Sequence, residues 1–374
     1  MATDPEKGEP KSVTAGELVL VTGGSGFIGS HLVTNLLRLG YTVRVYDNLE
    51  TGNILYLDLC AHPGALEFVH GDIINRTTLR TAMEGVRLVV HFGAASKVLP
   101  SLKNPRMATY NTEQNAIGTA NVLELAKATG LVRKVVYAAS STYYGNQRVP
   151  FHEDDPFVPS SPYAASKYMG ELQMSTYDKV FDLPTLSLRF FMVYGPRNPS
   201  SGAYAIVTGK FIERMRANEP LLIEGSGDSF RDFVHADDVA RACILGLQSS
   251  VRGVAINVGS GEAHSIKEVA DLVSTNQRHV APRPNDLLGT LADTCRAREL
   301  LHFSSRYRFL EELPKLIALA MAGDESLGAM WAQHRIAAAI ERHKPNWSAL
   351  GTVERGLAIR ALLVERPRFL SKLV

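Results

Sequence analysis

VLVTGGSGFIGS (Val19–Ser30) is the stretch from which the fold of this sequence can be predicted. The apolar run Leu18–Val21 leads into glycines, and apolar residues at helical spacing follow from Phe27 to Leu37. This order predicts a buried strand, a tight turn and the start of a helix. The regularly spaced glycines allow the turn, let a pyrophosphate approach the backbone and seat the helix on the strand: Gly23, Gly26 and Gly29. Because a helix N-terminus presents unpaired N–H groups to phosphates, we expect a dinucleotide site here.

The next apolar stretch indicates which dinucleotide the site prefers. Val43–Tyr46 is typical of a second strand, and it ends on Asp47. A carboxylate at this position can accept hydrogen bonds from the hydroxyls of an adenosine ribose, whereas a 2′-phosphate would meet a negative charge. The sequence therefore favours NAD over NADP.

Length, composition and charge exclude several other classes of protein. The chain has 374 residues, 45% of them hydrophobic, which is enough for one large domain or two modest ones. The formal net charge of +2 gives no reason to expect nucleic acid or a membrane as a partner. The cysteines Cys60, Cys243 and Cys295 are far apart, which fits a reducing compartment and no metal site. The polar segment Met1 to Lys11 lacks the apolar centre of a signal peptide, so we expect a cytoplasmic protein.

Apolar strands alternate with helical patterns through the first half of the chain. The expected strands are 18–21, 43–46, 66–69, 88–92, 132–139 and 185–190, and helical patterns cover 115–128 and 163–180. This βαβ rhythm predicts an α/β fold with a Rossmann-type, doubly wound parallel sheet. Small residues follow two strand ends, at Gly93–Ala95 and Ser140–Ser141, and leave room for a ligand at the carboxyl edge of the sheet.

Changes in composition suggest how the chain is divided. We expect a disordered tail at 1–16, an NAD-binding domain at 17–190, and a smaller α/β substrate-binding region at 191–320 that is mixed with the first domain. Residues 321–374 are rich in Ala and Leu, with Arg and Glu at helical spacing, and are expected to form a helical C-terminal extension. The expected role of this extension is packing against the body or a second subunit, not catalysis.

One pair of residues is suited to proton transfer. Tyr163 and Lys167 lie on one face of the expected helix 163–180. A tyrosine with its ordinary pKa of about 10 is a poor base near neutral pH, but an ammonium group and a positively charged nicotinamide both favour the phenolate. A hydroxyl at the preceding strand end can hydrogen-bond the same substrate oxygen, and the candidates are Ser140, Ser141 and Thr142.

Taken in order, these motifs resemble those of the extended short-chain dehydrogenases/reductases, in the nucleotide-sugar epimerase and dehydratase branch that includes UDP-glucose 4-epimerase. The resemblance covers roughly Leu18 to Ala320. Besides the glycine-rich stretch, it rests on Tyr46–Leu49, Gly71–Ile73, His91–Ala95, Ser140–Gly145, Tyr163 with Lys167, Arg189–Arg197, Arg231–His235 and Arg283–Asp286.

The resemblance implies roles for individual residues. Ser140, Tyr163 and Lys167 are the implied catalytic residues; Tyr163 is the acid/base, and Lys167 holds the nicotinamide ribose and lowers the tyrosine pKa. Residues expected to contact NAD are Gly23, Ser25, Gly26, Phe27, Ile28, Gly29, Asp47, Asn48, Asp72, Ile73, Phe92, Ala94, Ala95, Tyr163 and Lys167. Residues expected to contact a nucleotide sugar, with a UDP-sugar as the first choice, are Ser140, Ser141, Thr142, Met192, Arg231, Arg283, Asp286 and Thr290. The two arginines resemble those that clamp the diphosphate, which a planar guanidinium suits. We also expect a homodimer.

The residues after Ser140 distinguish the branches of this family. Dehydratases and decarboxylases carry an acidic residue two places before the tyrosine of the Tyr-Gly pair, where this chain has Thr142, with Ser141 beside it. Epimerases have small or hydroxyl residues there, so the resemblance implies epimerisation through transient oxidation of the fourth sugar carbon by NAD. A nucleotide-sugar dehydratase, decarboxylase or ketoreductase is one alternative. A non-catalytic NAD-binding regulatory or scaffold protein is another.

Two further positions bear on the sugar. Most relatives have asparagine at the position of Met192, where it contacts the nucleotide sugar, and methionine cannot donate such a hydrogen bond. Thr290 falls where a bulky tyrosine in the family excludes N-acetyl sugars. Threonine at this position implies a pocket that also admits N-acetylhexosamine or uronate nucleotides.

Overall fold

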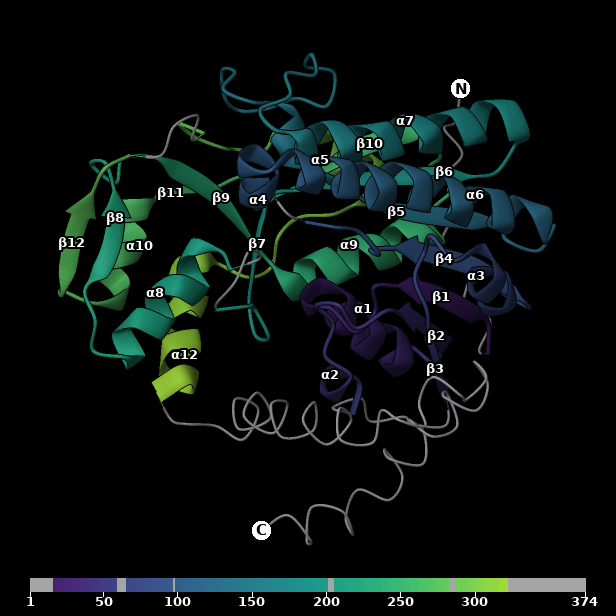
Figure 1. Cartoon of the computed structure of the whole chain (residues 1–374), viewed down its shortest axis with the longest axis horizontal. Coiled ribbons are helices and arrows are strands. Elements are labelled where there is room, and N and C mark those ends of the chain that lie inside the picture. Colours follow the sequence, from purple (N-terminus) through teal and green to yellow (C-terminus); the bar gives the residue numbers. More distant parts are fainter. Residues whose placement is uncertain (1–15, 59–64, 97, 201–204, 283–286, 322–374) are drawn as a thin grey trace, which may run out of the picture.

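The central element of the fold is a seven-stranded sheet with the strand order β10-β6-β5-β4-β1-β2-β3 (Figure 1). The computed structural model describes residues 16–58, 65–96, 98–200, 205–282 and 287–321. All neighbouring strands of the sheet are parallel. They are β1 (Leu18–Thr22), β2 (Thr42–Asp47), β3 (Leu66–His70), β4 (Leu88–His91), β5 (Lys134–Ser140), β6 (Thr185–Phe190) and β10 (Val254–Val258). The chain order reverses at β1, and such a switch point leaves a crevice at the carboxyl ends of the strands. The predicted Rossmann-type fold is confirmed.

Helices cover both faces of this sheet, so its strands are buried on both sides. Every residue of β5 is buried, as expected for a continuous apolar strand in a parallel sheet. Successive side chains of a strand point to opposite faces, so Val19 and Val21 join one apolar core and Leu20 joins the other. Figure 1 shows α6 and α7 on one side of β5 and α9 on the other. The helices of this larger part are α1 (Phe27–Arg38), α2 (Leu55–Asp58), α3 (Arg76–Met83), α4 (Val98–Lys103), α5 (Pro105–Thr112), α6 (Gly118–Ala128), α7 (Pro162–Phe181), α9 (Ala236–Gln248) and α11 (Cys295–Leu301).

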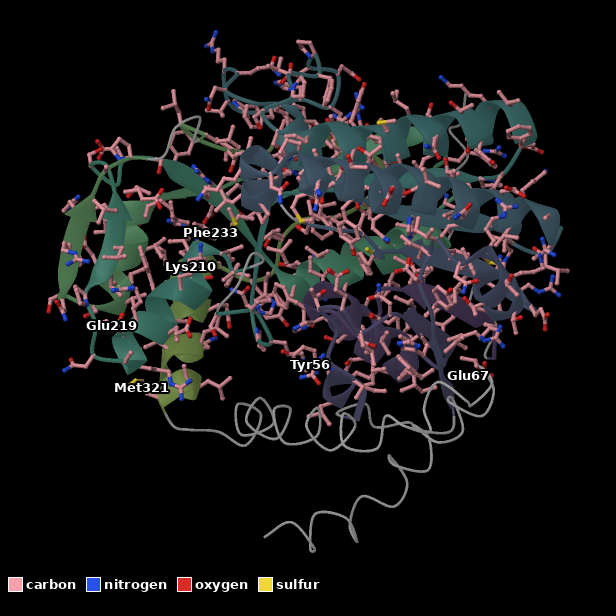
Figure 2. The ribbon with its side chains drawn as sticks, in the orientation of Figure 1. Tyr56, Glu67, Lys210, Glu219, Phe233 and Met321 are labelled. Atoms are coloured by element: carbon pink, nitrogen blue, oxygen red, sulfur yellow. The ribbon has the colours of Figure 1, made fainter. Side chains whose placement is uncertain are left out.

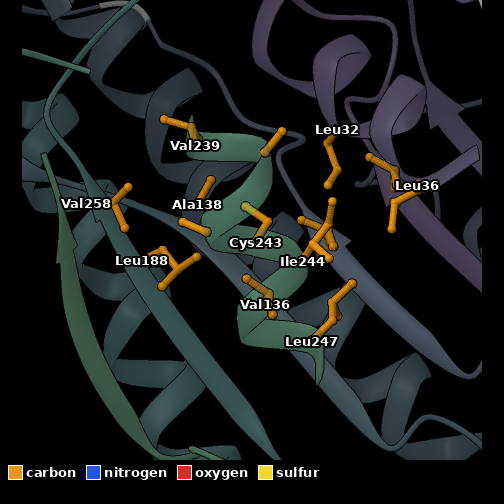
Figure 3. Close-up of a cluster of buried hydrophobic side chains, with 14 of the residues drawn as sticks. Leu32, Leu36, Val136, Ala138, Leu188, Val239, Cys243, Ile244, Leu247 and Val258 are labelled. Carbon is orange, nitrogen blue, oxygen red and sulfur yellow. The ribbon is translucent and has the colours of Figure 1, made fainter. Parts of the chain in front are cut away.

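In the largest apolar core, α9 and α1 pack against each other and against one face of the sheet. Figure 3 shows its side chains, which are all buried: Val239, Cys243, Ile244 and Leu247 of α9, Val136, Ala138, Leu188 and Val258 of the strands, and Leu32 and Leu36 of α1. Burial of each valine, leucine or isoleucine here contributes about 1.5–3 kcal/mol to stability. Because β9 runs directly into α9, this packing also holds the end of β9 close to the sheet.

A smaller region begins at the carboxyl end of β6. After the single residue Phe191, β7 (Met192–Tyr194) pairs in parallel with β9 (Phe230–His235), which pairs antiparallel with β11 (Ala263–Ser265). A second, parallel pair joins β8 (Leu221–Glu224) to β12 (Gln277–Val280). The helices of this region are α8 (Val207–Arg216), α10 (Ile266–Val273) and α12 (Phe309–Met321). Figure 2 places Phe233 and Lys210 in this region, and Phe233 is fully buried in its core.

One element differs from the sequence-based expectations. The predicted helix 115–128 starts as a π-helical turn, η2 (Glu113–Ile117), before α6 continues it. Strand β10 and helix α9 come from the segment 191–320 and belong to the large sheet and its core, as a region mixed with the first domain would. The helical extension at 321–374, apart from its first residue, and the tail at 1–15 lie outside the described residues and stay predictions. In the described part of the chain, no helix is long and apolar enough to cross a membrane.

Candidate active site

A cavity of about 630 Å³ lies at the carboxyl ends of β1, β2, β4 and β5. Except for Ser25, each predicted site residue in the described part of the chain lines it. These residues are Gly23, Gly26, Phe27, Ile28, Gly29, Asp47, Asn48, Asp72, Ile73, Phe92, Ala94, Ala95, Ser140, Ser141, Thr142, Tyr163, Lys167, Met192, Arg231 and Thr290. Arg283 and Asp286 lie outside the described residues. Segments that are far apart in sequence therefore meet in one place, as the positions of the strand ends predict.

The glycine-rich turn leaves no space for side chains at two of its positions. Gly23 has a φ of +69°, and a Cβ atom there would lie 2.8 Å from the backbone nitrogen of Gly93. A Cβ atom on Gly29 would lie 2.2 Å from the carbonyl oxygen of Gly23. Helix α1 then begins after Gly26, and no side chain in the described part caps it. The first N–H groups of α1 thus remain available at the cavity wall, which fits a bound pyrophosphate.

Asp47 ends β2 with its carboxylate held by two backbone groups. Its Oδ2 accepts a hydrogen bond from the N–H of Ser25 at 3.0 Å, and its Oδ1 accepts one from the N–H of Leu49 at 2.8 Å. Burial raises the pKa of the Asp47 carboxyl, and these two hydrogen bonds act in the opposite direction. Ser25 thus helps to position a carboxylate that lines the cavity, and its own contact with NAD stays a prediction. Each carboxylate oxygen keeps a further lone pair for a ribose hydroxyl.

The ends of β2 and β3 are joined by side chains. The Asn48 amide donates to Oδ2 of Asp72 at 2.9 Å, and Oδ1 of Asp72 accepts from the N–H of Ile74 at 3.0 Å. The Tyr46 hydroxyl donates to the carbonyl oxygen of Asp72 at 2.7 Å. Asn48 and Asp72 thus hold each other in place and form the end of the cavity next to Asp47.

The acid/base candidates lie at the other end of the cavity. Ser140 ends β5, and Tyr163 lies in the first turn of α7, whose N-terminus is capped by Ser161 through a 3.1 Å hydrogen bond from the N–H of Ala164. The Ser140 hydroxyl is 2.9 Å from the Thr142 hydroxyl. Interactions with the side chains of Ser96 and Ser140 lower the pKa of the Tyr163 phenol. The structure therefore brings together the hydroxyl groups that the sequence assigned to one substrate oxygen.

The sequence-based expectation for the pKa of Tyr163 did not include the effect of burial. We expected Lys167 to lower it, but burial has the largest effect and raises the pKa of the Tyr163 phenol. Interactions with the Ser96 and Ser140 side chains oppose this rise. Burial also lowers the pKa of Lys167 to about 7, so the ammonium that was expected to favour the phenolate is itself weakened. Desolvation thus has the largest effect on the pKa of Tyr163 in this structure, and the lowering expected from Lys167 together with a bound nicotinamide stays a prediction.

Lys167 lies near the aromatic ring of Tyr137 and the buried carboxylate of Glu171. Its Nζ lies 4.1 Å from the centre of the Tyr137 ring, and the Tyr137 hydroxyl donates to the Lys167 carbonyl oxygen at 3.1 Å. One turn further along α7, Glu171 forms a buried ion pair with Arg189, with N–O distances of 2.6 and 3.0 Å. The charge of Glu171 raises the pKa of Lys167 and so opposes its desolvation.

The wall opposite the sheet comes from the smaller region. Met192 lies on β7 and Arg231 on β9, and the pairing of these strands sets their spacing. Thr290 follows a bridge between Gly289 and Phe230 of β9; its N–H donates to the carbonyl oxygen of Phe230 at 3.1 Å. Its hydroxyl accepts from the N–H of Asp232 at 3.4 Å. The structure thus places Met192, Arg231 and Thr290 along one wall.

Other lining residues were missed by reasoning from the sequence. They include Glu50, Ser96, Tyr110, Gln114, Asn198 and Leu287. Ser96 directly follows the Gly93–Ala95 strand end, so its place could have been predicted. Tyr110 and Gln114 come from α5 and the π-helical turn, and no strand-end signal marks them. Among the described residues, no group of His, Cys, Asp and Glu side chains could hold a metal ion.

Known proteins with similar sequences and structures act on nucleotide sugars according to their names. A putative UDP-glucose 4-epimerase of Methanocaldococcus jannaschii is 35% identical over 259 residues, 68% of this chain and 81% of that protein. A UDP-N-acetyl-alpha-D-glucosaminuronate decarboxylase of Bacillus cytotoxicus is 32% identical over 257 residues, 67% of this chain and 77% of that protein. The structure of UDP-N-acetylglucosamine 4-epimerase from Methanobrevibacter ruminantium M1, in complex with UDP-N-acetylmuramic acid, matches with a TM-score of 0.77. It is 28% identical and covers 83% of this chain and 100% of that chain.

The same relationship is found at the level of the family. The profile of the family described as NAD dependent epimerase/dehydratase matches residues 19–259, from the glycine-rich strand β1 through β10. This range contains the glycine-rich turn, Asp47 and the Ser140, Tyr163 and Lys167 side chains. The chain therefore belongs to the NAD dependent epimerase/dehydratase family.

Proposed function

We propose that this protein is a nucleotide-sugar 4-epimerase that uses NAD and acts through a transient 4-keto sugar. One observation carries the proposal: the Ser140, Tyr163 and Lys167 side chains share a cavity with the hydroxyls of Ser141 and Thr142. Among the described lining residues, the carboxylates are Asp47, Glu50 and Asp72, which lie at or just after the ends of β2 and β3, at the far end of the cavity. A carboxylate that would assist elimination or decarboxylation is therefore not found beside Tyr163 in the described part of the wall.

The cavity residues can hold the cofactor and move the proton. The Gly23–Gly29 turn and the start of α1 would bind the pyrophosphate, and Asp47 would accept hydrogen bonds from the adenosine ribose. When bound, NAD supplies a reversible acceptor for the hydrogen on the fourth sugar carbon. Tyr163 removes the proton from the 4-hydroxyl and later returns it, while Ser140 hydrogen-bonds the same oxygen. Return of hydrogen to the opposite face of the keto sugar inverts that carbon with no net oxidation.

The substrate is proposed to be a UDP-sugar. Arg231 lines the cavity and offers a guanidinium that can bind two diphosphate oxygens at once. The named epimerase and decarboxylase relatives, which act on UDP-sugars by their names, support this class. Arg283 and Asp286 are proposed to complete the diphosphate site.

The proposal is tested by identifying the product. The purified protein is incubated with UDP-glucose, UDP-N-acetylglucosamine, UDP-glucuronate and the corresponding GDP- and dTDP-sugars, and the products are analysed by NMR. We expect the 4-epimer of at least one UDP-sugar, formed without net reduction of NAD. Tyr163→Phe, prepared in parallel, controls for contaminating epimerases. Loss of water or carbon dioxide, or stoichiometric oxidation of NADH, would instead identify the dehydratase, decarboxylase or ketoreductase alternative.

A homodimer is proposed as the working assembly. Met169, Leu172 and Val180 are 45%, 50% and 66% exposed and lie on one face of α7. Large apolar side chains grouped on a helix surface support burial against a second copy of the chain. Sedimentation velocity measures this directly: the full chain should sediment as a dimer, and Leu172→Glu should shift it toward monomer.

A further inference from the structure

A chain of buried hydrogen bonds runs beneath the cavity from the end of β1 to the helical turn that contacts α7. The N–H of Gly93 donates to Oγ1 of Thr22 at 3.0 Å, and Oγ1 of Thr22 lies 2.7 Å from Nδ1 of His91. Nε2 of His91 lies 3.0 Å from Oγ1 of Thr119, which is 2.6 Å from the carbonyl oxygen of Asn115. Thr22, His91, Thr119 and Asn115 are each at most 1% exposed. Water therefore does not compete for these bonds.

The direction of each bond determines which nitrogen of His91 carries the proton. A carbonyl oxygen can only accept, so the single proton of the Thr119 hydroxyl goes to Asn115. Thr119 must then accept from His91, which places the imidazole proton on Nε2. Nδ1 of the neutral ring is an acceptor and receives the proton of the Thr22 hydroxyl. His91 thus has one tautomer, and it donates to one side of the chain and accepts from the other.

Asn115 extends these hydrogen bonds to α7, the helix that carries Tyr163. Its Oδ1 accepts from the N–H of Ala95 at 2.8 Å, and its Nδ2 donates to the carbonyl oxygen of Ala95 at 2.9 Å. The same Nδ2 donates to the hydroxyl of Ser166 at 2.9 Å, and that hydroxyl donates to the carbonyl oxygen of Tyr163 at 2.8 Å. Asn115 therefore fixes Ala95, which lines the cavity beside Ser96, relative to the backbone of Tyr163.

We propose that His91 is a positioning residue that connects the dinucleotide end of the cavity to its acid/base end through the Nε2–H tautomer. Its Nδ1 holds Thr22 and, through it, the backbone of Gly93 against the glycine-rich turn. Its Nε2–H holds Thr119 and, through it, Asn115, Ala95 and the first turn of α7. The inference rests on the proposed role of Tyr163, because it states what places that hydroxyl opposite Ser140.

A histidine suits this position because it must donate and accept in opposite directions while staying neutral. Burial lowers the pKa of His91 to about 3, and the charge of Lys167 acts in the same direction. The Tyr137 ring lies against it, with the ring centres 5.6 Å apart. Tyr137 and Lys167 are the titratable neighbours in the described structure, and neither favours a protonated imidazole. The tautomer is therefore stable across the working pH range.

Two substitutions of His91 test its hydrogen bonds to Thr22 and to Thr119 separately. In His91→Asn, the amide oxygen takes the place of Nδ1, so the bond to Thr22 is retained and the bond to Thr119 is lost. In His91→Gln, the amide nitrogen takes the place of Nε2, so the bond to Thr119 is retained and the bond to Thr22 is lost. We expect His91→Asn to lower kcat by about ten- to hundredfold, because a misplaced acid/base is costly, with a smaller change in NAD affinity. His91→Gln should show the reverse, a larger loss of NAD affinity than of kcat.

Thr119 gives an independent variant on the acid/base side. Thr119→Val removes the hydroxyl with little change in volume and should reproduce the kcat loss of His91→Asn. Thr119→Ser retains the hydroxyl and should lose less. If the two His91 variants lose kcat and NAD affinity in equal proportion, each following its loss of thermal stability, the role is structural only and the proposal is overturned.

The tautomer itself can be observed without any assay of activity. Long-range ¹H–¹⁵N correlation spectra of the NAD-bound protein, with its 11 histidines labelled, distinguish a protonated ring nitrogen from an unprotonated one. The His91 signal is identified by its absence from the His91→Asn spectrum. We expect Nε2–H and no titration between pH 5 and pH 9; an Nδ1–H tautomer would overturn the inference. If the wild type epimerises no nucleotide sugar, the proposed function fails, while the spectra and NAD affinities still decide on His91.

Discussion

The two walls of the cavity are built in different ways. The wall formed by the large sheet consists of strand ends that are neighbours in one parallel core, each followed by a short continuous motif such as Gly23–Gly29. The opposite wall consists of Met192, Arg231 and Thr290, which come from distant segments and meet through a three-stranded sheet and one bridge. This difference suggests separate roles for the two walls. The first would bind the cofactor and move the proton, and the second would select the substrate.

Side-chain contacts link the segment that follows β7 to helices of the larger part. Nδ1 of His31 in α1 lies 2.8 Å from a carboxylate oxygen of Asp237, and its Nε2 lies 2.9 Å from the carbonyl oxygen of Pro196. The Arg197 guanidinium lies 5.6 Å from the centre of the ring of Tyr56, a residue of α2 that is labelled in Figure 2. The segment after β7 is thus tied to the helices behind the glycine-rich turn. If the two walls have these separate roles, a substitution in one wall should leave the role of the other wall largely intact.

The largest effect is expected from Tyr163→Phe. This substitution should abolish proton transfer at the wall formed by the large sheet and leave binding intact. Removal of the phenol hydroxyl should lower kcat by about 10²- to 10⁴-fold, as is typical for a lost general base. NAD content and the KM for the nucleotide sugar should change little, because neither depends on that hydroxyl. Steady-state kinetics and the absorbance of bound cofactor measure these quantities. Near-normal turnover would show that another group moves the proton.

The next effect concerns the pH dependence of turnover. Burial raises the pKa of Tyr163, and a neighbouring positive charge favours the phenolate. Lys167→Met removes such a charge, so the pKa of Tyr163 should rise further. The rising limb of kcat against pH should then move to higher pH, with about ten- to hundredfold lower turnover at neutral pH. An unmoved limb would mean that Lys167 only binds the cofactor.

Asp47→Ala should act on the cofactor and not on the sugar. Loss of a charge-assisted hydrogen bond to the ribose costs about 1.5–3 kcal/mol, or roughly ten- to hundredfold in NAD affinity. The preference for NAD over NADP should fall, because the repelling carboxylate is gone. Asp47→Asn is the matched control, since an amide oxygen can still accept from one of the two backbone N–H groups that hold Asp47. A wild-type protein that already prefers NADP would contradict this role.

Arg231→Ala tests the opposite wall. Loss of its contact with a diphosphate should raise the KM for the nucleotide sugar by about tenfold or more, with NAD affinity retained. Arg231→Lys keeps the charge but not the planar fork, so it should recover only part of the affinity. Arg283→Ala should behave in the same way. Unchanged KM values in both alanine variants would place the diphosphate elsewhere.

The same difference between the walls explains what could be predicted from the sequence. The glycine-rich turn, Asp47 and the Tyr163/Lys167 pair are continuous motifs with fixed places at strand ends or on one helix face, and the structure puts them in one cavity. The hydrogen bond from the backbone N–H of Ser25 to Asp47 was not predicted, because no side-chain pattern records it. The effect of burial on the pKa of Tyr163 was not predicted, because burial depends on tertiary packing and not on spacing.

The chain of buried hydrogen bonds through His91 could not be predicted from the sequence either. The π-helical turn at Glu113–Ile117 fits within an ordinary helical pattern, so the sequence predicts a regular helix there. His91 was noted only as part of the His91–Ala95 motif, since its two partners, Thr22 and Thr119, are far from it in sequence. Such long-range polar contacts need the pairing of β1 with β4 and the packing of α6 before they can be seen.

The smallest effect is expected from Thr290→Tyr. It tests whether the wall of the smaller region can change the choice of substrate without changing the chemistry at the other wall. Thr290 is buried, lines the cavity and holds β9 through its backbone N–H and its hydroxyl. A tyrosine would project its ring into the sugar side, and a steric clash rejects the larger of two ligands. We therefore expect the wild type to accept N-acetylhexosamine or uronate nucleotides as well as plain hexoses.

Thr290→Tyr should lower kcat/KM for the enlarged sugars by about five- to tenfold and leave the plain hexoses within about twofold. Thr290→Val is the control, because it loses the hydroxyl that accepts from Asp232 but keeps the volume of threonine. It should leave the ratio of kcat/KM between the two sugar classes unchanged. The measurement is that ratio for each variant, obtained by competition between two UDP-sugars in one reaction. A wild-type protein that accepts only UDP-glucose and UDP-galactose would place the size filter at another residue of this wall.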